Sequence, residues 1–373
     1  MKIRQALLLL VLLLVCPSGL KAQPAVRYTG TDASLGARWG WAQQQAGHQG
    51  GYWIGYSIYR MMGEDSFIGM WDTDKEQEAT LEAVIYGKAS PEEALPSEEA
   101  VRREAERVLF DLSTPGHIKK KERKEVALLF FFEQGAREPS GLQISNLTLY
   151  VDLKGHPLYW LGPKEDAESL AWLQGRYDRM KDPDLQEELL TAVGIHQDAA
   201  RVVPFLTAVL TGRGNDEVRE QAAFWLGQQQ DAGVLGLLIE TARKDRSPGV
   251  REQAVFAVSQ IEIPEATDAL IELARRGPDR EVREKAVFWL GQKASRRAEE
   301  ALRGFVDEEE DTGLQKQAVF ALSQLPDERA TPLLIDVAKT HRNPAVRKQA
   351  IFWLGQSEDP RALDLLIELV RGQ

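Results

Sequence analysis

Cysteine is almost absent from this chain of 373 residues. The single one, Cys16, lies in an N-terminal apolar run, so residues 23–373 contain none. These residues therefore cannot form a disulfide, a thiolate metal site or a thiol nucleophile. Their stability has to come from hydrophobic cores, and a chain of about 350 residues is long enough to build two domains.

Histidine is also scarce, and its neighbours exclude common catalytic sites. None of the histidines is followed by Glu and none recurs at a regular step; they are His48, His117, His156, His196 and His341. The patterns H-E-x-x-H, G-x-S-x-G and G-x-x-x-x-G-K-[ST] do not occur. We therefore expect a protein that is not an enzyme and that holds no cofactor and no metal.

Positive charge is in deficit over the whole chain. The formal net charge is −11, and it becomes −14 once Lys2, Arg4 and Lys21 are removed with residues 1–22. An acidic surface disfavours nucleic acid and anionic lipid as partners, because both carry negative charge. We expect neither as a partner.

Residues 1–22 have the pattern of a signal peptide. Lys2 and Arg4 precede the apolar run of residues 6–16, and Ala22 offers a small residue for cleavage. The run is too short to span a bilayer comfortably, which makes a membrane anchor the less favoured alternative. We expect a periplasmic or secreted protein with no stable membrane insertion after the signal is removed.

An eleven-residue phrase returns five times at a 32-residue step. It reads VREQAAFWLGQ from Val218, VREQAVFAVSQ from Val250, VREKAVFWLGQ from Val282, LQKQAVFALSQ from Leu314 and VRKQAIFWLGQ from Val346. A weaker copy begins at Leu185. A fixed period of this length indicates stacked supersecondary units, none of which can bury its apolar face alone.

Each repeat unit has the pattern of two helices. Counted from zero at the first residue of the phrase, the apolar positions 0, 4, 5 and 8 share one helical face. Polar capping residues precede the phrase, and a second apolar segment such as 266–276 follows it. We predict a mainly α chain with a small α+β domain over residues 23–180. An α-solenoid of about six αα-hairpins follows over residues 183–373.

The pattern V-R-x-x-A-x-x-x-L-G, with Asp or Asn and Pro before it, resembles HEAT repeats. It resembles more closely the short subtype named after phycobiliprotein lyases. Residues 157–173, together with the FWLGQ phrases, look like exported bacterial HEAT-repeat proteins. The resemblance implies an α-solenoid, but a fold does not carry a function with it. HEAT-like di-iron hydroxylases use repeated His-Glu pairs as ligands, and this chain has none.

Residues 23–180 do not repeat and read as strands with helices. We predict strands over 52–59 and 125–132, a hairpin of 147–153 with 157–162, and helices over 98–112 and 166–173. Trp39, Trp41 and Trp53 lie near His48 in sequence and favour an aromatic core. The alternative is a carbohydrate-binding surface or an enzyme site in this domain.

Phenylalanine and glutamine recur on the phrase helix away from its core face. Position 6 is always Phe: Phe224, Phe256, Phe288, Phe320 and Phe352. Position 3 is Gln in four copies, Gln221, Gln253, Gln317 and Gln349, and Lys285 in the other. Position 10 is always Gln: Gln228, Gln260, Gln292, Gln324 and Gln356. In a HEAT-like stack the phrase helix lines the concave side, so these residues would form parallel rows with rungs about 10 Å apart.

Two interpretations of these rows remain open. The Phe rings could only pack against the next repeat, or they could contact a ligand. Position 7 alternates between Trp225, Trp289 and Trp353 and the alanines Ala257 and Ala321, which favours tight inter-repeat packing for the tryptophans. The phenylalanines and glutamines are the better candidates for contact. The hypothesis is a scaffold or adaptor in the cell envelope that binds a protein or peptide on its concave face.

Overall fold

The computed structural model describes residues 24–31, 34–47, 50–64, 66–69, 79–87, 121–293 and 295–371. The predicted signal peptide, the predicted helix over 98–112 and His48 lie outside these residues. The described residues divide between Ser169 and Leu170 into two compact units. We call them the sheet unit and the repeat array, and each is considered by itself.

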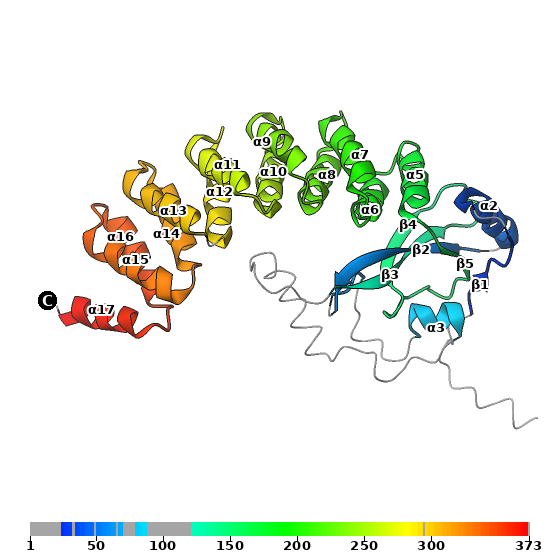
Figure 1. The fold of residues 1–373 in the computed structure, drawn as a ribbon, viewed down its shortest axis with the longest axis horizontal. Helices are drawn as coiled ribbons and strands as arrows, with labels where there is room; N and C mark the ends of the chain where they lie inside the picture. The colour runs from blue at the N-terminus through cyan, green and yellow to red at the C-terminus, as the bar shows by residue number, and fades with distance from the viewer. Residues whose placement is uncertain are drawn as a thin grey trace, which may run out of the picture. The chain divides into compact units, whose positions relative to one another are not determined.

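The sheet unit is built on a five-stranded mixed sheet with the order β1-β5-β2-β3-β4 (Figure 1). The strands are β1 (Val26–Arg27), β2 (Tyr52–Gly63), β3 (Lys121–Phe132), β4 (Gly141–Asn146) and β5 (Leu158–Pro163). Strands β2 and β3 pair antiparallel along their full length, with Tyr52 opposite Phe132. The strands predicted over 52–59 and 125–132 are therefore confirmed, and β2 and β3 each extend beyond the predicted range.

The predicted hairpin is wrong. β5 lies parallel to β2, with Ile54 opposite Tyr159, and residues 147–153 form no strand. Residues 147–153 instead bind the start of α3 (Leu81–Tyr86), where the backbone N–H of Leu81 donates to the carbonyl of Leu149 at 2.9 Å. The alternating leucines of 147–153 reflect burial against α3, because an apolar loop and a half-buried strand can share one sequence pattern.

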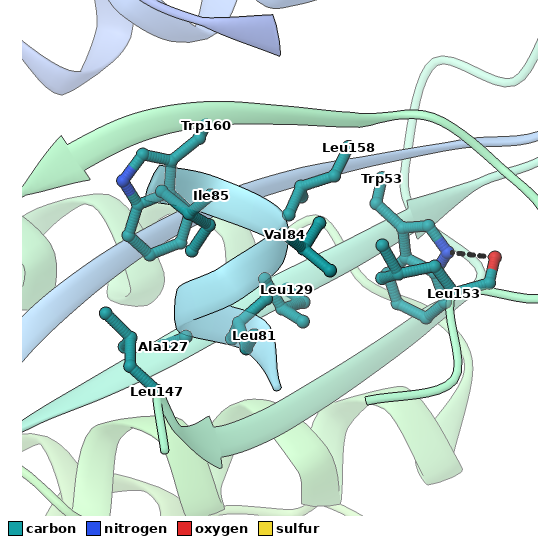
Figure 2. Packing of buried hydrophobic residues seen from close by; sticks show 10 residues of the cluster. All are labelled: Trp53, Leu81, Val84, Ile85, Ala127, Leu129, Leu147, Leu153, Leu158 and Trp160. Atoms are coloured by element: carbon teal, nitrogen blue, oxygen red, sulfur yellow. Dashed lines mark hydrogen bonds between the residues drawn. The ribbon is translucent and has the colours of Figure 1, made fainter. Parts of the chain in front are cut away.

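Helices cover both faces of this sheet. On one face, α2 (Leu35–Ala46) places Trp39 edge-on against Phe130, with ring centroids 5.3 Å apart. On the other face, α3 packs over the cluster drawn in Figure 2, where the Trp53 indole N–H donates to the carbonyl of Leu153 at 3.1 Å. Both faces of β2 are therefore buried over its first seven residues.

The repeat array consists of helix pairs in two layers, as Figure 1 shows. The phrase helices are α6 (Pro183–Gly194), α8 (Asp216–Gln228), α10 (Pro248–Gln260), α12 (Arg280–Lys293), α14 (Thr312–Ser323) and α16 (Pro344–Leu354). The second helices are α7 (Ala199–Thr211), α9 (Leu235–Lys244), α11 (Pro264–Arg276), α13 (Arg296–Glu308), α15 (Asp327–Thr340) and α17 (Pro360–Arg371). Helix α5 (Asp166–Tyr177) precedes them. The chain is mainly α, and its array follows the predicted repeat.

The predicted capping residues begin the phrase helices. Each one accepts a hydrogen bond from a backbone N–H of the first turn, which would otherwise lack a partner. The caps are Asn215, Ser247, Asp279, Asp311 and Asn343. These caps keep the five phrases in the same register, so that equal positions of the phrase face the same way in neighbouring units.

The arginine at position 1 ties one repeat to the next. Arg219 is 3% exposed and binds Asp216 of its own helix and Asp245 before the next phrase, at 2.6 Å each. Arg251 binds Asp279 in the same way at 2.7 Å. These ion pairs hold the phrase helix to the segment before the next phrase, and so they help to fix how adjacent phrase helices stack.

Candidate functional site

The phenylalanines of position 6 and the tryptophans of position 7 form one continuous row of ring contacts along the array. Phe224 stacks on Phe256 with centroids 5.7 Å apart, and Phe288 stacks on Phe320 at 6.2 Å. Trp289 joins the two stacks, because its ring lies 4.9 Å from both Phe256 and Phe288. We call this set the aromatic row.

The aromatic row continues to both ends of the array. Trp225 meets Phe224 edge-on at 5.1 Å. Trp353 lies 5.0 Å from Phe320 and 5.0 Å from Phe352. The row therefore crosses five phrase helices, from α8 to α16.

The alternation of Trp and Ala follows from two kinds of helix interface. A Cβ on Gly227 would lie 2.7 Å from the Cα of Ala257, so α8 and α10 touch backbone to backbone. Gly291 meets Ala321 in the same way between α12 and α14, where the added Cβ would lie 2.9 Å from the Cβ of Ala321. Trp289 stands at the alternate interface between α10 and α12, where position 9 is Ser259 and the Trp289 ring lies 4.9 Å from that of Phe256. The structure therefore supports the packing interpretation for the tryptophans.

The position-6 rings are packed and accessible at the same time. Phe224, Phe256, Phe288 and Phe320 are half-buried, and Phe352 is 54% exposed. Core phenylalanines of this protein, such as Phe130, are fully buried. The aromatic row therefore stabilises the stack and also presents ring surface to the outside.

A groove of about 640 Å³ lies along the aromatic row. It is lined from α8, α10, α12 and α14, and among the predicted residues it gathers Phe224, Phe256, Phe288, Gln253 and Gln317. A volume of this size is within the range of ligand-binding pockets. The groove is the place where the predicted Phe and Gln positions meet.

Sequence reasoning missed several groove residues. The additional lining residues are Glu220, Glu252, Glu284, Lys285, Trp289 and Gly249. A signal for the glutamates exists in the repeat, because they hold position 2 in three consecutive copies. Position 2 lies only about 40° from position 6 around the helix, so both face the same side.

Other predicted residues lie outside the groove lining. Gln221 donates through Nε2 to Thr191 Oγ1 of the preceding helix at 3.0 Å, and Gln349 is half-buried on α16. The position-10 glutamines do not reach the groove: Gln260 is buried and donates to Ser259 Oγ at 3.1 Å, while Gln228 and Gln292 are half-buried and Gln324 and Gln356 exposed. The position-10 row is separate from the groove because these residues lie at the end of the phrase helix.

Carboxylates dominate the electrostatics of the groove. Burial raises the pKa of the Glu220 carboxyl, and the carboxylates of Glu217, Asp216, Glu187 and Glu252 raise it further. Lys285 Nζ lies 3.2 Å from the carboxylate of Glu252, and Arg280 Nε lies 2.7 Å from that of Glu284. The groove therefore offers aromatic surface, amides and carboxylates side by side.

Trp39, Trp41 and Trp53 of the sheet unit do not form a sugar-binding surface. Trp39 is 2% exposed and Trp53 is 3% exposed, so both belong to the core as the aromatic-core interpretation predicts. Trp41 is half-buried and packs edge-on against Tyr28 at 5.2 Å. A platform of three exposed rings is therefore excluded.

The described residues contain neither a candidate metal cluster nor a candidate membrane span. Within the described ranges, no cluster of three or more His, Asp or Glu side chains is placed to bind a metal ion. No helix in the part of the chain that the structure describes combines the length and the apolar character needed to cross a bilayer.

Comparisons with known proteins point to the array. The model of the HEAT repeats family matches residues 203–287 and 267–342, and that of the PBS lyase HEAT-like repeat matches residues 346–372. No curated protein matches the chain.

Two solved structures are similar to this chain. The complex of CpcE and CpcF of phycocyanin lyase from a Nostoc species is 23% identical, with 46% of this chain and 70% of that chain covered and a TM-score of 0.32. Human deoxyhypusine hydroxylase in complex with glycerol is 26% identical, with 54% and 77% covered and a TM-score of 0.24. At such TM-scores neither likeness carries an argument about function.

Proposed function

We propose that this chain, a HEAT-repeat protein of the PBS lyase HEAT-like type, is a non-catalytic scaffold or adaptor. Its partner would be a polypeptide that lies along the aromatic row and in the groove beside it. The observation that carries the proposal is the row itself, in which half-buried Phe rings line a groove shared by four helices. Large accessible aromatic surfaces of this kind mark interaction sites.

The chemistry of the groove suits a polypeptide. The rings of Phe256 and Phe288 offer apolar contact area, and the amides of Gln253 and Gln317 can both donate and accept hydrogen bonds, as a peptide backbone requires. A groove that runs across several helices fits an extended ligand better than a compact one. The repeat-family matches agree with an interaction role, which is the use that stacked repeats with extended surfaces serve.

The signal-peptide pattern of residues 1–22 indicates the cellular compartment in which the proposed partner would be found. Lys2, Arg4 and the apolar run of residues 6–16 support an exported protein, so the proposed partner belongs to the cell envelope or to the space outside it. Fractionation of cells that express the full chain tests this part. Recovery of the uncleaved chain in the cytoplasm would contradict it.

Affinity capture from native envelope extracts tests the interaction. The triple variant Phe256→Ser, Phe288→Ser, Phe320→Ser should lose the partner that the unchanged chain captures, because each substitution removes a ring from the aromatic row. Leu363→Ser, which changes a side chain that is 60% exposed on α17, is the matched control and should keep the partner. Circular dichroism checks that the helices of each variant remain. A folded triple variant that captures the same proteins would overturn the proposal.

A further inference from the structure

The residue at position 2 of the phrase changes sign along the array. It is a carboxylate in the first four phrase helices, Glu187, Glu220, Glu252 and Glu284, and a lysine in the last two, Lys316 and Lys348. Three of these carboxylates line the groove beside the aromatic row. An acidic stretch of limited length therefore runs parallel to the rings and ends at Glu284 on α12.

These carboxylates form one continuous electrostatic feature. The carboxylates of Glu187 on α6 and Glu252 on α10 both act on Glu220, which lies between them on α8. The side chains of Glu252 and Glu284 are 31% and 38% exposed, so a ligand can reach them. Among the described residues, Glu220 has no ion pair within the chain.

Glu220 lies against the wall of the groove. A Cβ on Gly249, in the first turn of α10, would lie 2.0 Å from Glu220 Oε1, so the carboxylate lies directly beside the backbone of α10 at this glycine. This places a carboxylate against the wall of the groove, close to the ring of Phe224 on its own helix.

Lys285 shows how a cation binds in this groove. Its ammonium reaches from α12 to the carboxylate of Glu252 on α10, at 3.2 Å, while its own side chain remains 51% exposed. Lys285 occupies the position that is Gln in the other four phrases. An external cation would meet the same carboxylates and would compete with Lys285 for Glu252 and with Arg280 for Glu284.

The spacing of the repeats matches one extended conformation of a bound polypeptide better than another. Packed helices lie about 8–10 Å apart, so successive position-2 carboxylates recur at about that step. A polyproline-II helix advances about 3.1 Å per residue with three residues per turn, which brings every third side chain to the same face after about 9 Å. A β-strand returns a side chain to the same face after about 6.6 Å, which does not match.

We propose that the groove binds an extended polypeptide of polyproline-II geometry that carries Lys or Arg at every third residue. The cations pair with Glu220, Glu252 and Glu284, and the apolar or proline residues between them pack on Phe224, Phe256 and Phe288. Three of the four position-2 carboxylates line the groove and Lys316 follows the last of them, so the recognised segment holds about three cations. The inference rests on the proposed function and specifies its partner.

Synthetic peptides and the full chain test the inference by fluorescence anisotropy. The first peptide carries Lys at every third residue among Pro and Leu. The second has the same composition with its lysines adjacent, and the third has Glu in place of Lys. The first should bind about tenfold more tightly than the second, because only its lysines match the spacing of the carboxylates, and the third should not bind.

Variants of the chain test whether the groove carboxylates bind the peptide. Glu220→Gln, Glu252→Gln, Glu284→Gln should weaken the first peptide about tenfold, the loss expected for three partly exposed ion pairs. The control Glu265→Gln, Glu308→Gln, Asp364→Asn removes the same number of exposed carboxylates from second helices and should change affinity less than about twofold. Lys285→Gln should strengthen binding about threefold, because it removes the competing ammonium.

The outcomes separate this inference from the proposed function. Equal affinity for the two lysine peptides, or equal weakening by the control variant, would overturn the inference, because a generally acidic surface would then explain the binding. If the Phe triple variant still loses its captured partner in that case, the scaffold proposal stands. If the first peptide binds as expected while capture does not depend on the three rings, the scaffold proposal fails and the peptide specificity remains.

Discussion

Phenylalanine has different surroundings in the sheet unit and in the repeat array. Phe130 and Phe132 of β3 are fully buried, because α2 covers their face of the sheet. In the array, Phe352 is 54% exposed and the other position-6 rings are half-buried, although they also stack on one another. A phrase helix has neighbours on two flanks and a second helix behind it, which leaves one side open. The comparison teaches that ring stacking alone does not make a core.

The largest expected effect contrasts one ring from each unit. Phe130→Ala should destabilise the sheet unit by about 3–5 kcal/mol, because it opens a cavity in a closed core. Phe288→Ala should cost the array only about 1–2 kcal/mol, because the lost ring is already partly exposed. Hydrogen exchange of β3 and of α12, measured by mass spectrometry, reports each unit separately. Equal losses of protection would show that the row is ordinary core.

The two kinds of helix interface predict an intermediate effect. Gly227→Ala should destabilise the array by about 1–3 kcal/mol, because the new Cβ would lie 2.7 Å from the Cα of Ala257. Gly304→Ala is the matched control on α13, where an added Cβ meets nothing closer than 4.0 Å. It should stabilise the helix by about 0.5–1 kcal/mol. Urea unfolding followed by circular dichroism measures both, and a neutral Gly227→Ala would contradict the close interface.

The smallest expected effect depends on pH. Because burial and neighbouring carboxylates raise the pKa of Glu220 above 4.5, its ionised form disfavours the folded array. Glu220→Gln should therefore stabilise the array by up to about 0.5 kcal/mol at neutral pH. This gain should disappear as the pH falls below the usual pKa of glutamate, because Glu220 is then protonated in both states. Urea midpoints of variant and parent across this range give the measurement.

A carboxylate with the opposite shift is the control for that prediction. The backbone N–H groups of Leu314 and Gly313 lower the pKa of Asp311, which caps α14. Asp311 therefore stabilises the array above its usual pKa, and this contribution is lost as the pH falls through its lowered value. Asp311→Asn should thus lose stability at neutral pH, where Glu220→Gln gains it. The same sign of effect for both variants would contradict the electrostatic description of the groove.

The sequence predicted the array better than the sheet unit, for a physical reason. The repeat predicted that Phe256 and Phe288 share one helix face and that Asn215 and Ser247 begin helices. Five copies of one pattern agree on these assignments, whereas a single copy would leave them ambiguous. The sheet unit offers a single copy of each pattern, and there the leucines of 147–153 read as a strand although they pack around α3.

The glutamates of the groove were missed for a different reason. A charged residue on a helix is normally read as solvated, and Glu220 carries no local sign that it lies against Gly249 of the next repeat. The environment of Glu220 depends on which residues of neighbouring helices lie close to it, and these include the other carboxylates of the groove. The contact with Gly249 and the nearby carboxylates both result from the packing of α8 against α10, and a single sequence does not give these distances.

Photocrosslinking at the aromatic row tests the central claim most directly. Phe288 is replaced by p-benzoylphenylalanine in the full chain, and Leu363 on α17 is replaced in the same way as the control. The chain is then irradiated with the peptide that carries Lys at every third residue. If the row contacts a partner, position 288 should yield a peptide adduct and position 363 should not. Products at position 288 that join only helices of the same chain would contradict the account.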